Sequence, residues 1–433
     1  MARNIFALIC SLVVAAAFAA PSAATWSIVI CDEQTDEVAI GTVTCLNNYD
    51  LLAIVPVVVV GKGAGACQAA GDFNGIRRPI IFDNLIIGTP PEEILDLLAG
   101  ITGHQQRQYG IVDTQGRMIT FTGSQTYPWA GGVVGSLGSM YYAVQGNVLA
   151  GECVIDEIES ALLNTPGDIP EKLMAGMYAA YAVGGDGRCS CYPNNPTGCG
   201  CPVPDFDKSG HIGGMVVARI GDVDDDVCNA GGCADGDYFM RFNVAYQNDA
   251  QPDPVLQLQD LFDAWRADLL GRPDAIQTTV VFDPPRIPPN GLAQTTFTIT
   301  PLDWQGQPVT ADIDSLTVEH ADDSAGISAI GEVIDNGDGT WSVVLTAGNY
   351  CGIDLFVVTI DDGIRPVILM PEPMLEYCCR ADIDCSREVD IDDVFAVLAN
   401  WGPCDSCLED VNGDGMVDID DIFAVLADWG PCG

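Results

Sequence analysis

The sequence has few cationic side chains. Only 17 Lys and Arg stand against 61 Asp and Glu among 433 residues, so the formal net charge is −44. Because phosphate groups are bound by clustered cations, this balance argues against nucleic acid and anionic membranes as partners, and it favours cations such as calcium. Hydrophobic residues make up 48% of the chain, which argues against disorder. The acidic residues are therefore expected to cover folded surfaces.

Long apolar runs are missing after the first 24 residues. A membrane-spanning helix needs about 20 predominantly apolar residues, and no later stretch reaches that length. The first 24 residues combine Arg3, the apolar run 5–20 and the small residues 22–24, which is typical of a secretory signal peptide. We therefore expect cleavage before Thr25, no membrane span in the mature chain, and a secreted, periplasmic or cell-surface location.

The cysteines fit an oxidising compartment. Of the 18 cysteines, Cys10 belongs to the leader, which leaves 17 that are expected to form disulfides (18 minus 1). Because 17 is odd, one free thiol or one intermolecular bridge should remain. The cluster at residues 189–201 has C-x-C pairs without the two-residue gap of zinc knuckles, and no histidine lies near it. A disulfide-stapled loop is favoured there over a zinc site.

Composition and pattern divide the mature chain into three regions. Residues 25–271 mix short β-rich runs with helical stretches, and paired antiparallel strands followed by helices indicate sheets covered by helices. Residues 272–373 begin with a proline-rich segment and continue with alternating runs separated by turns, which is typical of a β-sandwich. Within them, the sequence DNGDGTW at residues 335–341 predicts a hairpin turn. This second region resembles invasin-type immunoglobulin-like (Ig-like) domains, which are commonly spacers or adhesive modules.

Residues 380–433 contain two acidic repeats that begin 28 residues apart, at Asp382 and Asp410. Each repeat places oxygen-bearing residues at the ligand positions of an EF-hand loop, so we expect bound Ca²⁺. The second loop also has Gly415 at the turn position, whereas Arg387 replaces that glycine in the first loop and predicts weaker affinity there. The predicted ligands are Asp382, Asp384, Ser386, Asp390 and Asp393 in the first loop, and Asp410, Asn412, Asp414, Met416, Asp418 and Asp421 in the second.

One helix rather than two follows each calcium loop. This tandem layout resembles type I dockerin domains, which anchor secreted enzymes to a partner. The resemblance implies a small α domain of the dockerin or EF-hand type, and a cohesin-like or cell-surface partner. The WGPC ending of both repeats and the lack of a clear Ser-Thr pair at the helix starts depart from the dockerin pattern.

Thr25 would become the first residue after signal cleavage, and a β-rich run begins on it. An N-terminal threonine can be a nucleophile because its own α-amine, with an unperturbed pKa of roughly 7.7 to 8.0, can act as the base. Such a nucleophile needs a rigid element to hold its geometry. Many exported proteins begin with Thr by accident, so the position alone is a weak signal.

The motifs TWSIVICDEQTDEVAIGTV, RQYGIVDTQGR, FTGSQTYPWAG, YAVQGNVLAG and GGDGR resemble the uncharacterised bacterial domain-of-unknown-function-1028 (DUF1028) family. That family is similar to N-terminal-nucleophile (Ntn) hydrolases. The resemblance implies an α+β fold, the αββα four-layer sandwich, over residues 25–271, with Thr25 as the nucleophile. A cysteine-rich insertion after Arg188 interrupts the pattern.

Several polar residues are candidates for supporting roles. Gln145 and Asn147 could supply amide donors to an oxyanion, or residues 146–147 could simply form a turn. Lys62 could lower the pKa of the terminal amine, or lie at the surface. Charged residues that could orient the terminus or bind substrate, or instead form structural ion pairs, are Asp32, Arg107, Asp186 and Arg188.

Two functional hypotheses remain open. In the first, the protein is a secreted Ntn amidohydrolase acting on an unknown amide or peptide-like substrate and tethered by its C-terminal repeats. In the second, it is a non-catalytic extracellular binding or cell-surface protein that keeps only the Ntn-like scaffold. Neither the substrate nor the oligomeric state follows from the sequence.

Overall fold

The computed structural model describes residues 25–224, 227–287, 289–349, 352–377, 381–384, 386, 388–404 and 407–431. The predicted signal peptide and Arg387 lie outside these ranges. The chain forms two compact units. The first holds most of residues 25–259, and the second holds most of the remainder together with residues 32–37 and 219–223.

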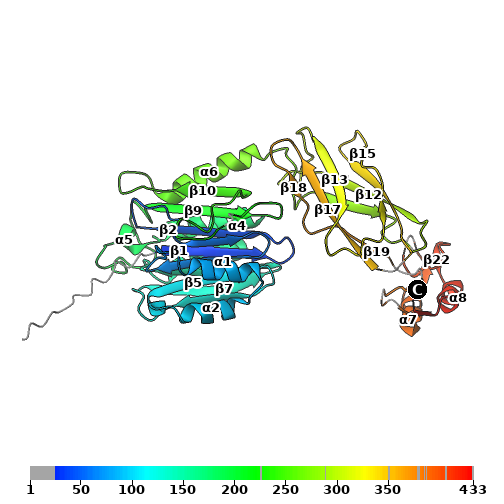
Figure 1. Cartoon of the computed structure of the whole chain (residues 1–433), viewed down its shortest axis with the longest axis horizontal. Coiled ribbons are helices and arrows are strands. Elements are labelled where there is room, and N and C mark those ends of the chain that lie inside the picture. Colours follow the sequence, from blue (N-terminus) through cyan, green and yellow to red (C-terminus); the bar gives the residue numbers. More distant parts are fainter. Residues whose placement is uncertain are drawn as a thin grey trace, which may run out of the picture. The chain divides into compact units, whose positions relative to one another are not determined.

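The first unit contains a six-stranded sheet with the order β10-β9-β2-β1-β8-β7. Strand β1 lies inside this sheet, between β2 and β8 (Figure 1). Its pairing with β2 is antiparallel and places Trp26 opposite Val43, so the two β-rich runs form a hairpin around residues 33–36. The strands are β1 (Thr25–Asp32), β2 (Val38–Thr44), β7 (Ala130–Leu137), β8 (Met140–Asn147), β9 (Ile212–Ala218) and β10 (Met240–Val244).

A second sheet of four antiparallel strands has the order β3-β4-β5-β6. The sequence pattern at residues 51–67 predicts one buried strand, but the chain turns back at Gly61 (φ 65°) and forms the hairpin of β3 and β4. Glycine suits this turn because it adopts positive φ without steric cost. The strands are β3 (Pro56–Val59), β4 (Gly63–Ala69), β5 (Arg107–Asp113) and β6 (Met118–Thr122).

The two sheets share one buried apolar cluster, to which Val29 and Ile40 of the first sheet and Val58, Ala66 and Val112 of the second contribute. Helices α3 and α4 pack against β2, β7 and β8, while α1 and α2 pack against β3 to β6. The first unit is thus a mixed α+β domain. Its helical elements are α1 (Arg78–Ile86), α2 (Pro91–Ala99), the 3₁₀ helix η1 (His104–Gln106), α3 (Cys153–Asn164), α4 (Ile169–Ala182) and α5 (Gly187–Ser190), followed by α6 (Pro254–Asp268).

Residues 279–377 of the second unit are rich in strands, as the alternating pattern predicts. One sheet is built on the order β11-β12-β16-β14, with β15 paired to β16, and the other on β13-β17-β18, with β19 paired to β17. Phe297, Leu345 and Phe356 lie in their common core. The strands are β11 (Thr279–Asp283), β12 (Gln294–Thr300), β13 (Ser315–His320), β14 (Ala329–Ile330), β15 (Ile334–Asp335), β16 (Trp341–Thr346), β17 (Gly352–Asp361), β18 (Val367–Ile368) and β19 (Met374–Tyr377).

The predicted turn at residues 335–341 is confirmed, since β15 and β16 pair on either side of it. In the acidic repeats, one helix per repeat is also confirmed. Short strands cross between the repeats, because β20 pairs with β23 and β21 with β22. The elements are β20 (Glu388–Val389), α7 (Ile391–Ala399), β21 (Gly402–Pro403), β22 (Met416–Val417), α8 (Ile419–Ala427) and β23 (Gly430–Pro431).

The cysteines of the cluster at residues 189–201 all form disulfides, which confirms the stapled loop over the zinc site. Two further thiols, Cys31 and Cys67, are buried. The disulfides in the described ranges are Cys45–Cys189, Cys153–Cys201, Cys191–Cys199, Cys228–Cys233 and Cys404–Cys407. Within the same ranges, no helix is long and apolar enough to cross a membrane.

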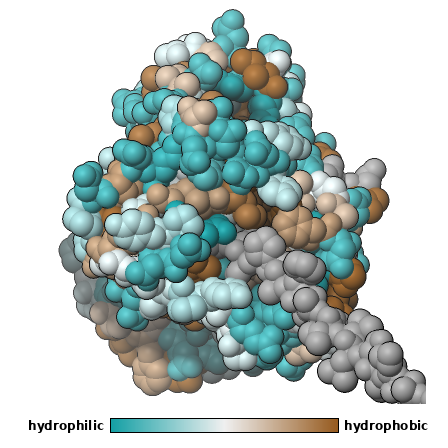
Figure 2. Space-filling view, turned by 90° about the vertical axis from the view of Figure 1, so that its left-hand side faces the viewer, coloured by the Kyte–Doolittle hydropathy of each residue, from teal (hydrophilic) through white to brown (hydrophobic). Residues whose placement is uncertain are grey.

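The face of the molecule in Figure 2 is covered mainly by hydrophilic residues, with apolar residues in smaller groups between them. Some carboxylates are buried as well, among them Asp72, Asp186 and Asp393.

Candidate functional site

Thr25 begins β1 and is only 1% exposed in the uncleaved chain. Its carbonyl oxygen accepts a hydrogen bond from Gln68 Nε2 at 2.9 Å. The same Nε2 lies 3.4 Å from the carbonyl oxygen of Gln145 on the neighbouring strand β8. One side chain from the second sheet therefore holds β1 and β8 together at the end where Thr25 lies.

A buried network of amide and hydroxyl groups extends from Gln68. Its Oε1 accepts a hydrogen bond from Ser27 Oγ at 2.5 Å, and its Nε2 donates to Gln108 Oε1 at 2.8 Å. Gln108 Nε2 in turn donates to the carbonyl oxygen of Gly146 at 2.9 Å. Ser27 Oγ also contacts Thr42 Oγ1 at 2.9 Å. These side chains are neutral, so the network supplies hydrogen bonds and no acid or base.

The network was not predicted from the sequence. Gln68 and Gln108 are each 1% exposed or less, although each is a polar residue inside a short strand. The signal that could have found them is an isolated glutamine between apolar or small residues, as in GACQA. A buried amide needs partners, and those partners come from strands that are distant in sequence.

Gln145 and Asn147 belong to β8 rather than to a turn, which settles the conformation of residues 146–147. Gln145 Nε2 lies 3.4 Å from the carbonyl oxygen of Ser27, and both residues are fully buried. Asn147 is two residues further along β8. The structure therefore brings Gln145 to the Thr25 end of β1, where its amide is engaged with the backbone.

Asp186 and Arg188 lie close to the same end. Since Trp26 pairs with Val43, Thr25 falls beside Thr44, and the backbone N–H of the following Cys45 donates to Asp186 Oδ2 at 2.7 Å. Arg188 Nη2 contacts the same oxygen at 2.8 Å, and Asp186 also caps α5. This carboxylate is thus held as a structural ion pair and helix cap.

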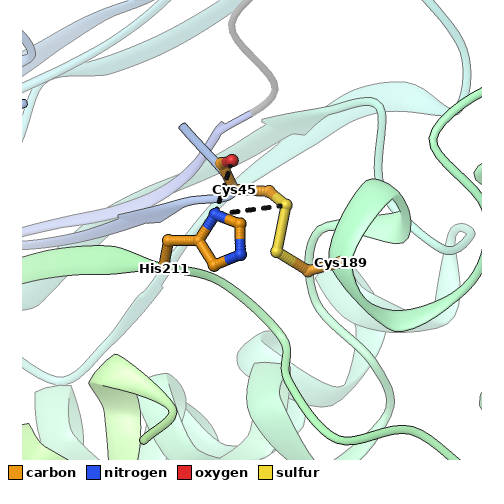
Figure 3. A group of neighbouring side chains, drawn as sticks. All are labelled: Cys45, Cys189 and His211. Carbon is orange, nitrogen blue, oxygen red and sulfur yellow. Dashed lines mark hydrogen bonds between the residues drawn. A yellow bond between two sulfur atoms is a disulfide. The ribbon is translucent and has the colours of Figure 1, made fainter. Parts of the chain in front are cut away.

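Figure 3 shows His211 beside the Cys45–Cys189 disulfide. Its Nδ1 lies 3.0 Å from the carbonyl oxygen of Cys45, and its Nε2 lies 2.7 Å from Asp249 Oδ1. The sequence assigned no role to this histidine. Because both sulfur atoms are engaged in a disulfide, they are not thiolate ligands. This group is therefore a disulfide with a histidine packed beside it, and not a metal site.

The structure does not bring the other predicted residues to Thr25. Lys62 is exposed in the β3–β4 turn, six residues before Gln68, and six residues of strand span roughly 20 Å. Asp32 ends β1 and caps the turn that follows, with its Oδ1 accepting from the N–H of Gln34 at 2.9 Å. Arg107 follows the alternation of β5 and points to the face opposite Gln108.

In the first acidic repeat, Asp382, Asp384 and Asp393 place carboxylate oxygens within 4.8 Å of one another. Such a group could hold a metal ion, and carboxylate oxygens are what Ca²⁺ prefers. Asp393 is fully buried and accepts N–H bonds from Ile383 at 2.5 Å and from Asp390 at 2.9 Å. It also forms a capping box with Asp390 at the start of α7. Ser386 joins this loop through its N–H, 2.9 Å from Asp382 Oδ1.

The second repeat has the same helix cap, with Asp418 and Asp421 in a capping box at the start of α8. Among the described residues, however, it does not bring three carboxylates within that distance. The carboxylate of Asp410 accepts hydrogen bonds from backbone N–H groups of its own loop, those of Gly413 and Gly415, at 2.8 Å each. Asp414 likewise accepts from the N–H of Met416 at 2.9 Å, and Asn412 Oδ1 accepts from the N–H of Asp414 at 2.9 Å. The second loop thus matches the EF-hand sequence pattern better, but its carboxylate oxygens lie further apart than those of the first loop.

Comparison with family models covers two parts of the chain. Residues 25–191 match a family of unknown function, DUF1028, and residues 274–365 match domain 3 of invasin. The chain carries a DUF1028 domain. An invasin-type Ig-like domain follows it, and neither match includes residues 380–433, so the dockerin resemblance gains no support. No curated protein matches the sequence.

Solved structures give further matches. A DUF1028-family protein from Silicibacter pomeroyi is 17% identical, with 56% of this chain and 88% of that chain covered and a TM-score of 0.38. InvD of Yersinia pseudotuberculosis is 20% identical over 26% of this chain and 30% of that chain, with a TM-score of 0.20. The adhesin InvE of Yersinia pseudotuberculosis is 24% identical over 22% of this chain and 26% of that chain, with a TM-score of 0.17.

The buried amide network predicts that Gln68→Met destabilises the DUF1028 domain. The substitution keeps the volume but leaves Ser27 Oγ, Gln108 Oε1 and the Thr25 carbonyl without this partner. We expect a loss of about 3 kcal/mol, or roughly 6–12 °C in Tm, measured by thermal unfolding of the full chain. Gln106→Met, at an exposed position of η1, is the control and should change Tm by less than about 1 °C. Equal Tm values for the two variants would contradict this role of Gln68.

The carboxylate cluster predicts that Ca²⁺ stabilises the C-terminal repeats through Asp393. Saturating Ca²⁺ should raise the Tm of their unfolding transition, and EGTA should lower it, because an ion bound only to the folded state stabilises that state. Asp393→Asn should lose most of the difference between the two conditions, whereas Asp392→Asn, an exposed neighbour outside the cluster, should keep it. An unchanged Tm of the natural chain in EGTA would refute the calcium assignment.

Proposed function

We propose that this protein is an extracellular or cell-surface binding protein in which the DUF1028 domain has a scaffold or binding role. The observation that carries the proposal is the match of residues 274–365 to an invasin domain. Invasin-type domains commonly serve as spacers or adhesive modules of surface proteins, and we expect the same role here. The disulfides of the first compact unit, such as Cys45–Cys189 and Cys153–Cys201, support folding in an oxidising compartment.

The surroundings of Thr25 also favour a non-catalytic role. Asp186 is engaged by Arg188 and by a backbone N–H, and Gln145 is engaged with the backbone of β1. Lys62 and Arg107 lie elsewhere in the domain. Asp186 and the Nε2 of Gln145 are therefore used to hold strands together, whereas Gln145 Oε1 is buried without a hydrogen-bond partner among the described residues.

For the fold, we propose that the DUF1028 domain is an Ntn-like αββα sandwich. Support comes from the contacts of α3 and α4 with one sheet, of α1 and α2 with the other, and from the apolar cluster that both sheets share. In this proposal the domain keeps the Ntn-like fold but has lost catalysis by Thr25. The insertion after Arg188 is then an additional loop, closed by disulfides, near the Thr25 end of β1.

For the C-terminal repeats, we propose a calcium-stabilised module that binds a cohesin-like or cell-surface partner. The two helices expose equivalent aromatic residues, with Phe395 of α7 56% exposed and Phe423 of α8 59% exposed. Bound Ca²⁺ would hold each loop against its helix through Asp393 and Asp421. This would keep the exposed side chains in fixed positions.

The location is tested by producing the full chain with its own leader and separating cytoplasm, cell surface and medium. We expect the protein outside the cytoplasm with Cys45 and Cys189 joined, because thiols do not stay reduced in an oxidising compartment. Mass spectrometry of non-reduced peptides identifies this bond. Protein found in the cytoplasm with both thiols reduced would contradict the proposal.

Catalysis by Thr25 is the second candidate, and the observation in its favour is that Thr25 begins an interior strand and is held there by Gln68. An acylating probe such as a β-lactone separates the two candidates. If the first proposal holds, the mature protein gains no probe mass on the peptide that begins at Thr25. A stoichiometric mass gain that persists in Thr25→Ser and is lost in Thr25→Ala would favour the nucleophile instead.

A further inference from the structure

Three arginines of this cation-poor chain gather on one side of the four-stranded sheet. Arg77 and Arg78 stand at the start of α1, and Arg107 begins β5. Arg78 is fully buried, Arg77 is 3% exposed, and Arg107 is half-buried. This group, called here the arginine cluster, lies on the face of β5 opposite Gln108 and is distinct from the surroundings of Thr25.

Backbone contacts fix where the arginines lie. Arg77 Nη2 donates to the carbonyl oxygen of Thr102 at 2.5 Å, which places it beside the residues that lead into η1 and Arg107. Arg78 Nη2 donates to the carbonyl oxygens of Asp72 and Asn229 at 3.3 and 3.2 Å. Asn229 belongs to the loop that the Cys228–Cys233 disulfide closes.

The aromatic residues beside the cluster form a wall. Tyr109 lies two residues after Arg107 in β5, so its side chain points to the same face. The His104 ring stacks on Phe121, with ring centroids 4.1 Å apart, and its centroid is 5.7 Å from that of Tyr109. His104 and Arg107 are half-buried and reach the solvent, whereas Arg77 and Arg78 are buried behind them in the domain. Burial and the charge of Arg77 lower the pKa of His104, so this histidine adds little positive charge near neutral pH.

Asp72 is the acidic residue in contact with the cluster, and its carboxylate is already occupied. Its oxygens accept the backbone N–H groups of Ile76 at 3.3 Å and of Arg77 and Arg78 at 3.0 Å each. Arg77 Nη1 and Arg78 Nε each form an ion pair with Asp72 at 3.6 Å, a distance longer than that of a hydrogen bond. Asp72 therefore caps α1 and leaves guanidinium donors unused.

The other charged groups that the structure describes do not neutralise the cluster. Asp235 acts on Arg78 more weakly than Asp72 does, and it is paired with Arg241. Burial raises the pKa of the Cys67 thiol to about 12, so Cys67 is uncharged near neutral pH. Among the described residues, three guanidinium charges thus meet the one carboxylate of Asp72. Burying unpaired charge costs free energy unless a counter-charge is supplied.

Four guanidinium nitrogens are buried without a hydrogen-bond acceptor among the described residues: Arg77 Nε, Arg78 Nε, Arg78 Nη1 and Arg107 Nε. Native proteins rarely leave such donors without partners. The planar guanidinium group matches the paired oxygens of carboxylate and phosphate groups. These guanidinium nitrogens therefore lack hydrogen-bond acceptors, and negatively charged oxygen atoms would suit them best.

We propose that the arginine cluster of the DUF1028 domain binds a small oxyanion, either a phosphate or a carboxylate group, through Arg77, Arg78 and Arg107. The anion supplies the acceptors that Asp72 does not, and Arg107 lies at the solvent side where the anion enters. The aromatic wall of His104, Tyr109 and Phe121 limits the ligand to a small group or to the end of a larger molecule.

The test uses isothermal titration of the full chain with inorganic phosphate at constant ionic strength and in EGTA, which prevents precipitation with Ca²⁺. We expect saturable binding of one phosphate per chain. Arg107→Gln should weaken the affinity at least tenfold, and Arg107→Lys, which keeps the charge without the planar fork, should fall between the two. Acetate, sulfate and chloride in separate titrations distinguish carboxylate, tetrahedral oxyanion and halide binding.

Arg117→Gln is the matched control, because Arg117 lies just before β6 of the same sheet and pairs with Asp113 outside the cluster. It should bind phosphate with unchanged affinity. Arg77→Gln is a second variant, and far-UV circular dichroism checks that each variant is folded. Absence of saturable binding, equal affinities in Arg107→Gln and the natural chain, or an equal loss in Arg117→Gln would overturn the proposal. A binding signal that grows without saturation as the phosphate concentration rises would be a general salt effect and would also overturn it.

Discussion

The hydrogen bonds of Gln68 are the constraint on which the arrangement around Thr25 depends. This side chain comes from the second sheet and engages the backbones of β1 and β8 in the first. Apolar contacts between sheets are tolerant of small shifts, but a buried amide requires its partners at fixed distances and angles. The network therefore sets how the two sheets meet at this end of the domain, and it does so with neutral groups that are unsuited to proton transfer.

The second constraint is electrostatic. A chain with a net charge of −44 would be expected to spread its few cations as partners for surface carboxylates. Instead, Arg77, Arg78 and Arg107 lie together and are largely removed from water. Burial lowers the pKa of Arg78 and of Arg107, and the charge of Arg77 lowers that of Arg107 further, because both effects disfavour the charged form. Such a cluster is more easily explained by a ligand than by stability, since burial of unpaired charge rarely stabilises a fold.

The local elements could be predicted because their causes are local. Acidic spacing located the two repeats with one helix each, although their calcium binding stays a prediction. C-x-C spacing favoured disulfides in residues 189–201, and DNGDGTW located the turn between β15 and β16. The β3–β4 hairpin was missed because an apolar run does not show where a chain reverses, and only Gly61 marked it. The sequence could not predict that the first loop, with Asp382, Asp384 and Asp393, brings its carboxylates closer together than the second loop does. This outcome depends on which backbone N–H groups each carboxylate accepts.

The sequence by itself determined the regions that match the DUF1028 and invasin families and the cysteines available for cross-linking, and it predicted the oxygen ligands of the two acidic repeats, because each depends on composition or short spacing. The tertiary structure decided which polar residues meet. It placed Gln68 and Gln145 beside Thr25, left Lys62 at a distant turn, and turned Arg107 to the face opposite Gln108. These outcomes follow from strand register and alternation, because moving a strand by one residue exchanges the faces on which all its side chains lie.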